Sequence, residues 1–305
     1  MRYRTDKEEW SFLDAVSASR KKRFGRIMNK YSLVHLTSAA TPPPELIRTA
    51  ARCGFDCVGL RSIPTRTGQK VDAVREAVTG KNPFPLADDA ALRAETRRAA
   101  ENEGVFINDV ENARIFDGVD VRNYERDLAA AAELGVRHVL TNIWTPDKAF
   151  YTEKFAELCE LAEGYGIDIN LEIVTWSAVP GLREAAELLF AVNRPNQGIV
   201  LDTIHFYRSR NTLEDLEGLP RGWFRYIHMC DAPPEIPTGD ELIRTGLEER
   251  LVPGEGAVDI KGIVEKLPGA VRGLEIPNKK RIEAMGLEPY LKDALERTKR
   301  YLGET

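Results

Sequence analysis

Cysteine and histidine are both scarce, with four residues of each in a chain of 305. The cysteines form no Cys-x-x-Cys pair, so neither a disulfide framework nor a cysteine zinc site of the usual spacing is expected. No apolar run approaches the roughly 20 residues of a membrane span. A net charge of −5 argues against a broad basic surface for nucleic acid. These absences predict a cytoplasmic protein that binds neither nucleic acid nor membrane.

The first 30 residues differ from the rest in charge, with nine Lys or Arg against four acidic residues. They lack the apolar segment of a signal peptide. We interpret residues 1–30 as an N-terminal extension and residues 31–305 as one large domain. The extension is either a flexible arm or an arm that contacts another subunit, because Trp10, Phe12 and Phe24 need burial. A homo-oligomer is therefore expected, and a small second subunit is an alternative.

Short apolar runs alternate with longer helical patterns throughout the chain, which is typical of a parallel sheet. The runs are Tyr31–Thr37, Phe55–Arg61, Val105–Val110, Arg137–Trp144, Asp168–Val174, Gly198–Ile204, Phe224–Cys230 and Arg272–Ile276. Gly104, Gly135, Gly166 and Gly198 follow one another at intervals of 31, 31 and 32 residues, the length of one strand–helix unit. Eight units and the lack of a Gly-x-Gly-x-x-Gly motif favour a single (β/α)8 TIM barrel over an open doubly wound sheet.

Helix boundaries and connection lengths agree with the barrel. Pro42–Pro44 and the aspartates before Ala90 are good helix starts, and the intervals between a helix and the next strand are short. Two connections after strands are long, Ser62–Ala87 and Asp231–Val258. Barrel enzymes build their sites from the connections that follow the strands, so this asymmetry predicts an enzyme.

Four polar residues interrupt the last four apolar runs near their carboxyl ends. They are Glu172, Asp202, His228 and Glu275. Their apolar neighbours should face the helices, so these four side chains should point into the barrel. Three carboxylates crowded in a low-dielectric site would repel one another or take up protons. One divalent cation resolves this conflict, and Mn is the expected metal, with Mg, Co or Zn as alternatives.

The same residues carry a resemblance to a known family. The set of Glu172, Asp202 with His205, His228 with Asp231, and Glu275 resembles the sugar phosphate isomerase/epimerase group of xylose-isomerase-like TIM barrels. Residues 54–61, 132–139 and 253–256 support it, and the likeness spans about residues 31–303. It implies the four residues as metal ligands and His205 as a contact to a substrate oxygen, with Asp231 as a further substrate-binding residue. The endonuclease branch of the superfamily is least similar, because it needs more histidines.

The ligand set predicts a metal-dependent isomerase or epimerase acting on a small polyhydroxy carbonyl compound. Glu172 and Glu275 would move a proton next to the carbonyl, while the metal stabilises an enediolate. If a leaving group lies β to the carbonyl, the same chemistry gives a lyase, such as an inosose or dehydroshikimate dehydratase or a deglycosidase subunit. A metal-bearing subunit without turnover of its own is a third hypothesis, which the two candidate acid/base glutamates disfavour.

Further side chains near the carboxyl ends of the runs are candidates for substrate binding. Arg61 can bind a carboxylate or a hydroxyl pair, or form a salt bridge at the rim, and Glu111 can bind substrate or a ligand. Glu255 is expected to aim inward from its glycine-flanked turn, with a plain surface turn as the alternative. Arg244 and Arg250, in the connection after the seventh run, are either lid contacts or, as we favour, residues of a solvated helix face. Aromatic side chains suited to sugar faces complete the candidates: His35, Trp144 and Trp176.

Overall fold

The computed structural model describes residues 30–64 and 84–304. Eight parallel strands close into a barrel in chain order, β1 pairing with both β2 and β8. The strands are β1 Tyr31–Val34, β2 Cys57–Arg61, β3 Phe106–Glu111, β4 His138–Thr141, β5 Asp168–Glu172, β6 Gln197–Asp202, β7 Tyr226–Met229 and β8 Val271–Leu274. The predicted TIM barrel is confirmed. The extension proposed for residues 1–30 lies outside the described residues, apart from Lys30.

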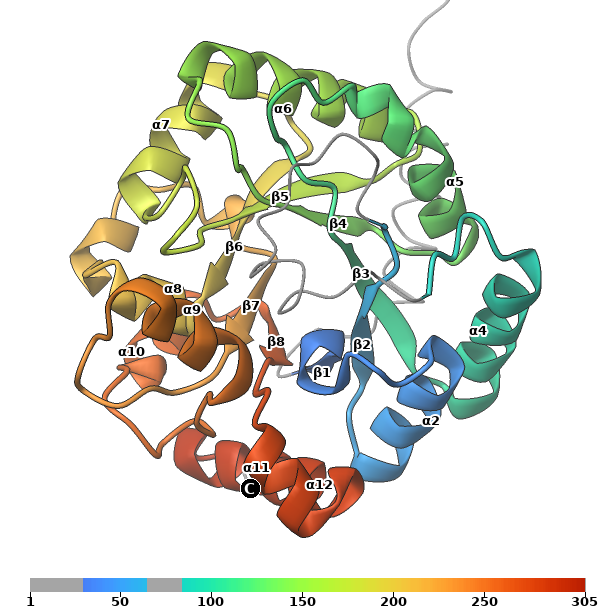
Figure 1. The fold of residues 1–305 in the computed structure, drawn as a ribbon, viewed down its shortest axis with the longest axis vertical. Coiled ribbons are helices and arrows are strands. Elements are labelled where there is room, and N and C mark those ends of the chain that lie inside the picture. The colour runs from blue at the N-terminus through green and yellow to red at the C-terminus, as the bar shows by residue number, and fades with distance from the viewer. Residues whose placement is uncertain (1–29, 65–83, 305) are drawn as a thin grey trace, which may run out of the picture.

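Helices surround the strands as an outer ring (Figure 1). They are α2 Pro43–Cys53, α4 Ala90–Glu103, α5 Glu125–Glu133, α6 Lys148–Glu163, α7 Leu182–Val192, α8 Thr203–Arg208, α9 Gly239–Glu248, α10 Ile260–Lys266, α11 Lys279–Met285 and α12 Leu287–Leu302. Short 3-10 helices are η1 His35–Ser38, η2 Val121–Tyr124, η3 Leu213–Leu216 and η4 Arg221–Trp223. No helix in these ranges combines the length and apolarity needed to cross a bilayer.

Side-chain alternation along the strands separates two apolar cores. In β6, Ile199 and Leu201 pack into the large core between strands and helices, whereas Val200 packs inside the barrel. Leu140 and Tyr226 lie in that same inner cluster. Each fully buried aliphatic side chain contributes roughly 1.5–3 kcal/mol to folding. The period-two pattern therefore decides which side chains reach the barrel interior.

The predicted apolar runs extend beyond the strands, mostly at the carboxyl ends. The first run continues to Thr37, but β1 ends at Val34 and the 3-10 helix η1 follows. Beyond β5 and β8, Ile173 and Ile276 remain fully buried although they are outside the ladder. The first residues of the connections after the strands are thus still buried. Hydrophobicity alone therefore cannot locate the last residue of a strand that pairs with its neighbour.

The regularly spaced glycines serve two purposes. Gly104, Gly135 and Gly166 have φ of 66°, 76° and 66°, the left-handed conformation that ends a helix. Gly198 instead lies within β6, where a Cβ would stand 2.3 Å from Nη1 of Arg225 and 2.5 Å from Oδ1 of Asn170. The first three mark helix ends, as predicted, while the fourth makes room inside the barrel.

Candidate metal centre

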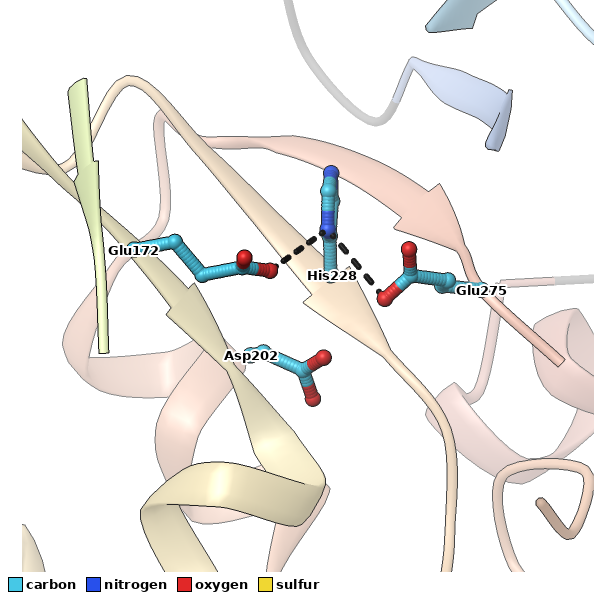
Figure 2. Close-up of side chains that lie close together, drawn as sticks. All are labelled: Glu172, Asp202, His228 and Glu275. Carbon is cyan, nitrogen blue, oxygen red and sulfur yellow. Dashed lines mark ion pairs between the residues drawn. The ribbon is translucent and has the colours of Figure 1, made fainter. Parts of the chain in front are cut away.

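The four predicted ligands converge at the carboxyl end of the barrel. Glu172 and Asp202 end β5 and β6, His228 lies within β7, and Glu275 directly follows β8. All four are buried, and each offers a ligand atom within 4.8 Å of the others. Glu172 and Glu275 approach His228 from opposite sides, and Asp202 points into the same space (Figure 2). Nδ1 of His228 lies 3.6 Å from Oε1 of Glu172 and 3.4 Å from Oε2 of Glu275.

A buried guanidinium joins two of these carboxylates. Nη1 of Arg250 donates to Oδ2 of Asp202 at 2.7 Å and to Oε2 of Glu275 at 2.8 Å. Nε of Arg250 donates to the carbonyl oxygen of Gly246 at 2.6 Å. Only 2% of this residue is exposed, so the expectation of a solvated helix face for Arg250 is wrong. Arg244 does lie on such a face, with ion pairs to Glu241 and Glu249.

The crowded charges shift the pKa values of the cluster. Burial, together with the nearby Glu275 and Glu172, raises the pKa of Asp202 to about 7 despite Arg250. Burial would also raise the pKa of Glu275, but Arg250 and His228 hold it well below its usual range. Burial would lower the pKa of His228, yet Glu275 and Glu172 raise it well above. The protein alone therefore retains protons here that a cation could replace.

The carboxylate of Glu172 accepts a hydrogen bond from Asn142, and the indole of Trp144 orients the amide of Asn142. Nδ2 of Asn142 donates to Oε2 of Glu172 at 3.3 Å, and Nε1 of Trp144 donates to Oδ1 of Asn142 at 2.6 Å. Trp144 therefore has a defined structural role, which is to fix Asn142.

His205 and Trp176 lie next to the four-residue cluster, on the side of Asp202. Nδ1 of His205 accepts from the backbone N–H of Thr175 at 3.3 Å and lies 2.9 Å from its hydroxyl, while Nε2 is 4.0 Å from Oδ2 of Asp202. Burial lowers the pKa of His205 well below its usual value, so the ring is neutral and carries its proton on Nε2. Trp176 meets His205 edge to face at 4.8 Å, and α9 packs on its ring at Gly246.

Arg61, Glu111 and His35 lie together on the other side of the barrel mouth. Nη1 of Arg61 is 3.7 Å from Oε2 of Glu111. Burial raises the pKa of Glu111 to about 7, with Arg61 opposing the rise and Glu275 adding to it. The Nε2–H of His35 faces the carbonyl oxygen of Thr41 at 2.8 Å, and its Nδ1 accepts from the backbone N–H of Arg61 at 3.1 Å. Both ring nitrogens of His35 thus form hydrogen bonds with the backbone, and its ring stacks on Phe84.

Two other candidates engage the protein instead of the barrel centre. The carboxylate of Asp231 accepts backbone N–H groups of Ala232, Gly254, Gly256 and Val258. The carboxylate of Glu255 pairs with Arg281 of α11 at 2.6 Å and Arg297 of α12 at 2.7 Å. Glu255 therefore faces the outer helices and does not aim inward as expected.

Arg250 and Asn142 contact the proposed ligands, and neither of them was predicted from the sequence as part of the metal centre. Arg250 carries a detectable signal, because it precedes the apolar pair Leu251 and Val252, which is unlike a solvated helix face. Asn142 interrupts the fourth apolar run in the same way that the four proposed ligands interrupt theirs.

The donor set itself fits a divalent cation. Three carboxylates and one imidazole suit metals of intermediate hardness such as Mn, Co or Zn. Nδ1 of His228, the nitrogen next to Glu172 and Glu275, is buried and makes no hydrogen bond within the described part of the chain, as expected of a ligand atom whose partner is an ion. These residues form a buried cluster that can hold a metal ion.

Some known proteins are similar to this chain in part of their sequence, and others have the same fold over nearly the whole chain. An inosose isomerase from Bacillus licheniformis is 35% identical over 115 residues, which cover 37% of this chain and 40% of the relative. The curated relatives that the chain matches are covered over 36–52% of their own length.

Solved structures with the same fold cover nearly all of the chain. The IOLI protein with a bound zinc atom has a TM-score of 0.69 at 19% identity, covering 90% of this chain and 98% of that one. A probable 3-DHS dehydratase, AsbF from Bacillus anthracis, has a TM-score of 0.65 at 15% identity, covering 90% and 98%. The family model of the xylose isomerase-like TIM barrel matches residues 47–301. The chain therefore belongs to the family of xylose isomerase-like TIM barrels.

Proposed function

We propose that the chain is a divalent-metal-dependent isomerase or epimerase of a small polyhydroxy ketone, with an inosose as the first candidate. The convergence of Glu172, Asp202, His228 and Glu275 within 4.8 Å carries this proposal. The charges support it, because three carboxylates and Arg250 reach neutrality with a doubly charged cation and an uncharged His228. The inosose isomerase relatives support the substrate class. Mn stays our prediction for the metal.

A divalent ion on these ligands would supply a Lewis acid that polarises the substrate carbonyl. Glu172 and Glu275 face each other across the site (Figure 2), so one carboxylate can take the proton from the carbon beside the carbonyl and the other can return it. The electron pair of the broken C–H bond moves to the carbonyl oxygen and returns when the new C–H bond forms. Return to the opposite face of the same carbon gives an epimer. Return to the former carbonyl carbon gives an isomer when the adjacent hydroxyl passes its proton to the former carbonyl oxygen and the electron pair of that O–H bond forms the new C=O bond.

The remaining side chains orient the substrate in this proposal. Nε2 of His205 donates to a substrate oxygen beside Asp202, and Arg61 contacts a more distant hydroxyl. Trp176 provides an apolar wall for a carbon ring, a common arrangement in sugar sites. Asn142 and Arg250 keep the two acid/base carboxylates in place, since each donates to one of them.

Glu111 supports a lyase as the second candidate. Elimination requires a proton for the departing hydroxyl, and the pKa of Glu111, raised by burial to about 7, leaves a substantial fraction of this carboxyl protonated near neutral pH. The same proton removal by Glu172 or Glu275 would then be followed by loss of water.

Solvent exchange separates these reactions. The metal-loaded protein is incubated in D2O with inososes, ketoses and a dehydroshikimate, and the products are analysed by mass spectrometry and NMR. Isomerisation keeps the carbon skeleton and its oxygens and incorporates deuterium, whereas elimination removes the mass of water. Glu172→Gln and Glu275→Gln should each lower turnover at least 100-fold in either case, within the range contributed by general acid–base groups. Unchanged turnover in both variants would contradict the assigned roles.

A further inference from the structure

The barrel interior next to the metal centre contains a buried carboxylate that the proposed reaction does not use. Asp109 of β3 is 1% exposed. Its Oδ1 accepts from Nδ2 of Asn108 at 2.8 Å. Its Oδ2 has no hydrogen-bond partner among residues 30–64 and 84–304, and the same holds for Nε2 of His228 and the hydroxyl of Tyr226. Buried polar atoms without a partner need an explanation, and these three belong to side chains that face the barrel interior.

Two glycines allow Asp109 and His228 to lean into the same space. Gly59 of β2 is paired with Asp109, and a Cβ there would lie 2.8 Å from Oδ2 of Asp109. Gly273 of β8 is paired with His228, and a Cβ there would lie 3.2 Å from Cδ2 of His228, the carbon bonded to Nε2. Strand β1 separates β2 from β8. Both side chains therefore lie over a glycine next to β1, from opposite sides, and Cγ2 of Val34 on β1 borders the same space, 2.8 Å from the Cβ position of Gly273.

Tyr226 borders the same space. It precedes His228 by two residues on β7 and faces the same interior, with the two ring centroids 5.6 Å apart. Burial raises the pKa of Tyr226, and Asp109 adds most to the rise among the nearby charges. For Asp109, burial raises the pKa and His228 opposes the rise most strongly. The three groups are thus within electrostatic reach of one another.

We propose that Asp109 is a positioning residue for the metal ligand His228, acting through one buried water that Tyr226 also contacts. The three groups make no direct hydrogen bond, so a bridging water is the arrangement that satisfies them, and buried waters usually have two to four such partners. The Nε2–H of His228 donates toward Asp109, which fixes the tautomer whose Nδ1 lone pair faces Glu172 and Glu275. Metal-bound histidines usually donate their second N–H to a carboxylate or a carbonyl in this way.

This inference depends on the proposed metal site, and a metal titration tests the two separately. Chelator-treated protein is titrated with Zn²⁺ in competition with a chromophoric chelator. Asp109→Asn should weaken binding roughly 10- to 100-fold, the usual effect of losing such a partner. Tyr226→Phe should weaken it by a smaller factor. Asp127→Asn is the matched control, because Asp127 is a buried carboxylate on α5 in the outer ring.

The outcomes distinguish each failure. If wild type binds Zn²⁺ and Asp109→Asn and Tyr226→Phe both bind within twofold of wild type, the positioning role is wrong. If wild type binds none, the proposed metal function fails instead. Melting temperatures of the metal-free variants separate a folding defect from a site defect. Should Asp109→Asn not fold, the Tyr226→Phe titration alone decides, since it removes a single hydroxyl.

Discussion

At the scale of single residues, Arg250 is central to the electrostatics of the site. One guanidinium nitrogen contacts two proposed metal ligands, and Cys230 lies beside it with Sγ at 3.4 Å. A buried guanidinium lowers the repulsion between Asp202 and Glu275 before any cation binds. Together, the guanidinium and the three ionised carboxylates carry a net charge that one divalent ion neutralises.

Replacing Arg250 should destabilise the metal-free protein. Arg250→Met removes the guanidinium that two buried carboxylates share and leaves His228 as the charged neighbour of Glu275, which we expect to lower the free energy of unfolding by about 3–5 kcal/mol at pH 8. The loss should shrink at pH 5.5. Burial already raises the folded-state pKa of Asp202 above its unfolded value, so its stability penalty grows as pH rises and disappears on protonation. Urea unfolding at the two pH values measures this.

Arg244→Met is the control for this prediction. Arg244 makes its ion pairs with Glu241 and Glu249 at the surface, where such pairs contribute under about 1 kcal/mol. A change of that size in both variants, at both pH values, would contradict the role assigned to Arg250.

At the scale of elements, the connection from Asp231 to Val258 is organised by its first residue. The carboxylate of Asp231 accepts hydrogen bonds from the backbone N–H groups of Gly254, Gly256 and Val258. These bonds hold the end of the connection against its beginning. Gly256 has to be glycine, because a Cβ would stand 2.1 Å from the carbonyl oxygen of Ala232. The anchored connection carries α9 over Trp176 and delivers Arg250 to the site.

Loosening this anchor should affect stability and the site together. Asp231→Asn replaces one accepting oxygen with an N–H donor facing backbone N–H groups. We expect a loss of about 1–3 kcal/mol in unfolding free energy, the cost of unsatisfied buried groups. Faster proteolysis within residues 232–257 and weaker metal binding should accompany it. Asp240→Asn, an exposed change on α9, should do neither; equal behaviour of the two variants would argue against the anchor.

The sequence predicts elements better than their ends. The start of α4 at Ala90 and its stop at Gly104 follow from capping chemistry, since Asp89 accepts from the backbone N–H of Leu92. The carboxyl ends of strands lack such a mark, because buried residues such as Ile173 continue the apolar pattern past the ladder.

At the scale of the whole molecule, closure of the barrel could be predicted because each of the eight units repeats the same pattern of an apolar strand followed by a helix. The convergence of the four proposed ligands could also be predicted, since a polar residue inside an apolar run is unusual wherever the run lies. The fates of Glu255 and Arg250 could not, because each depends on partners distant in sequence. Glu255 pairs with residues of α11 and α12, and Arg250 pairs with Asp202 at the end of β6 and with Glu275 just after β8.

The central claim is that Glu172, Asp202, His228 and Glu275 bind one divalent cation. Isothermal titration of the chelator-treated chain with Mn²⁺ and Zn²⁺ measures it most directly. We predict one ion per chain, a melting temperature raised by several degrees at saturation, and loss of binding in His228→Gln. Absence of binding by the wild-type chain, or binding that His228→Gln leaves intact, would contradict the account.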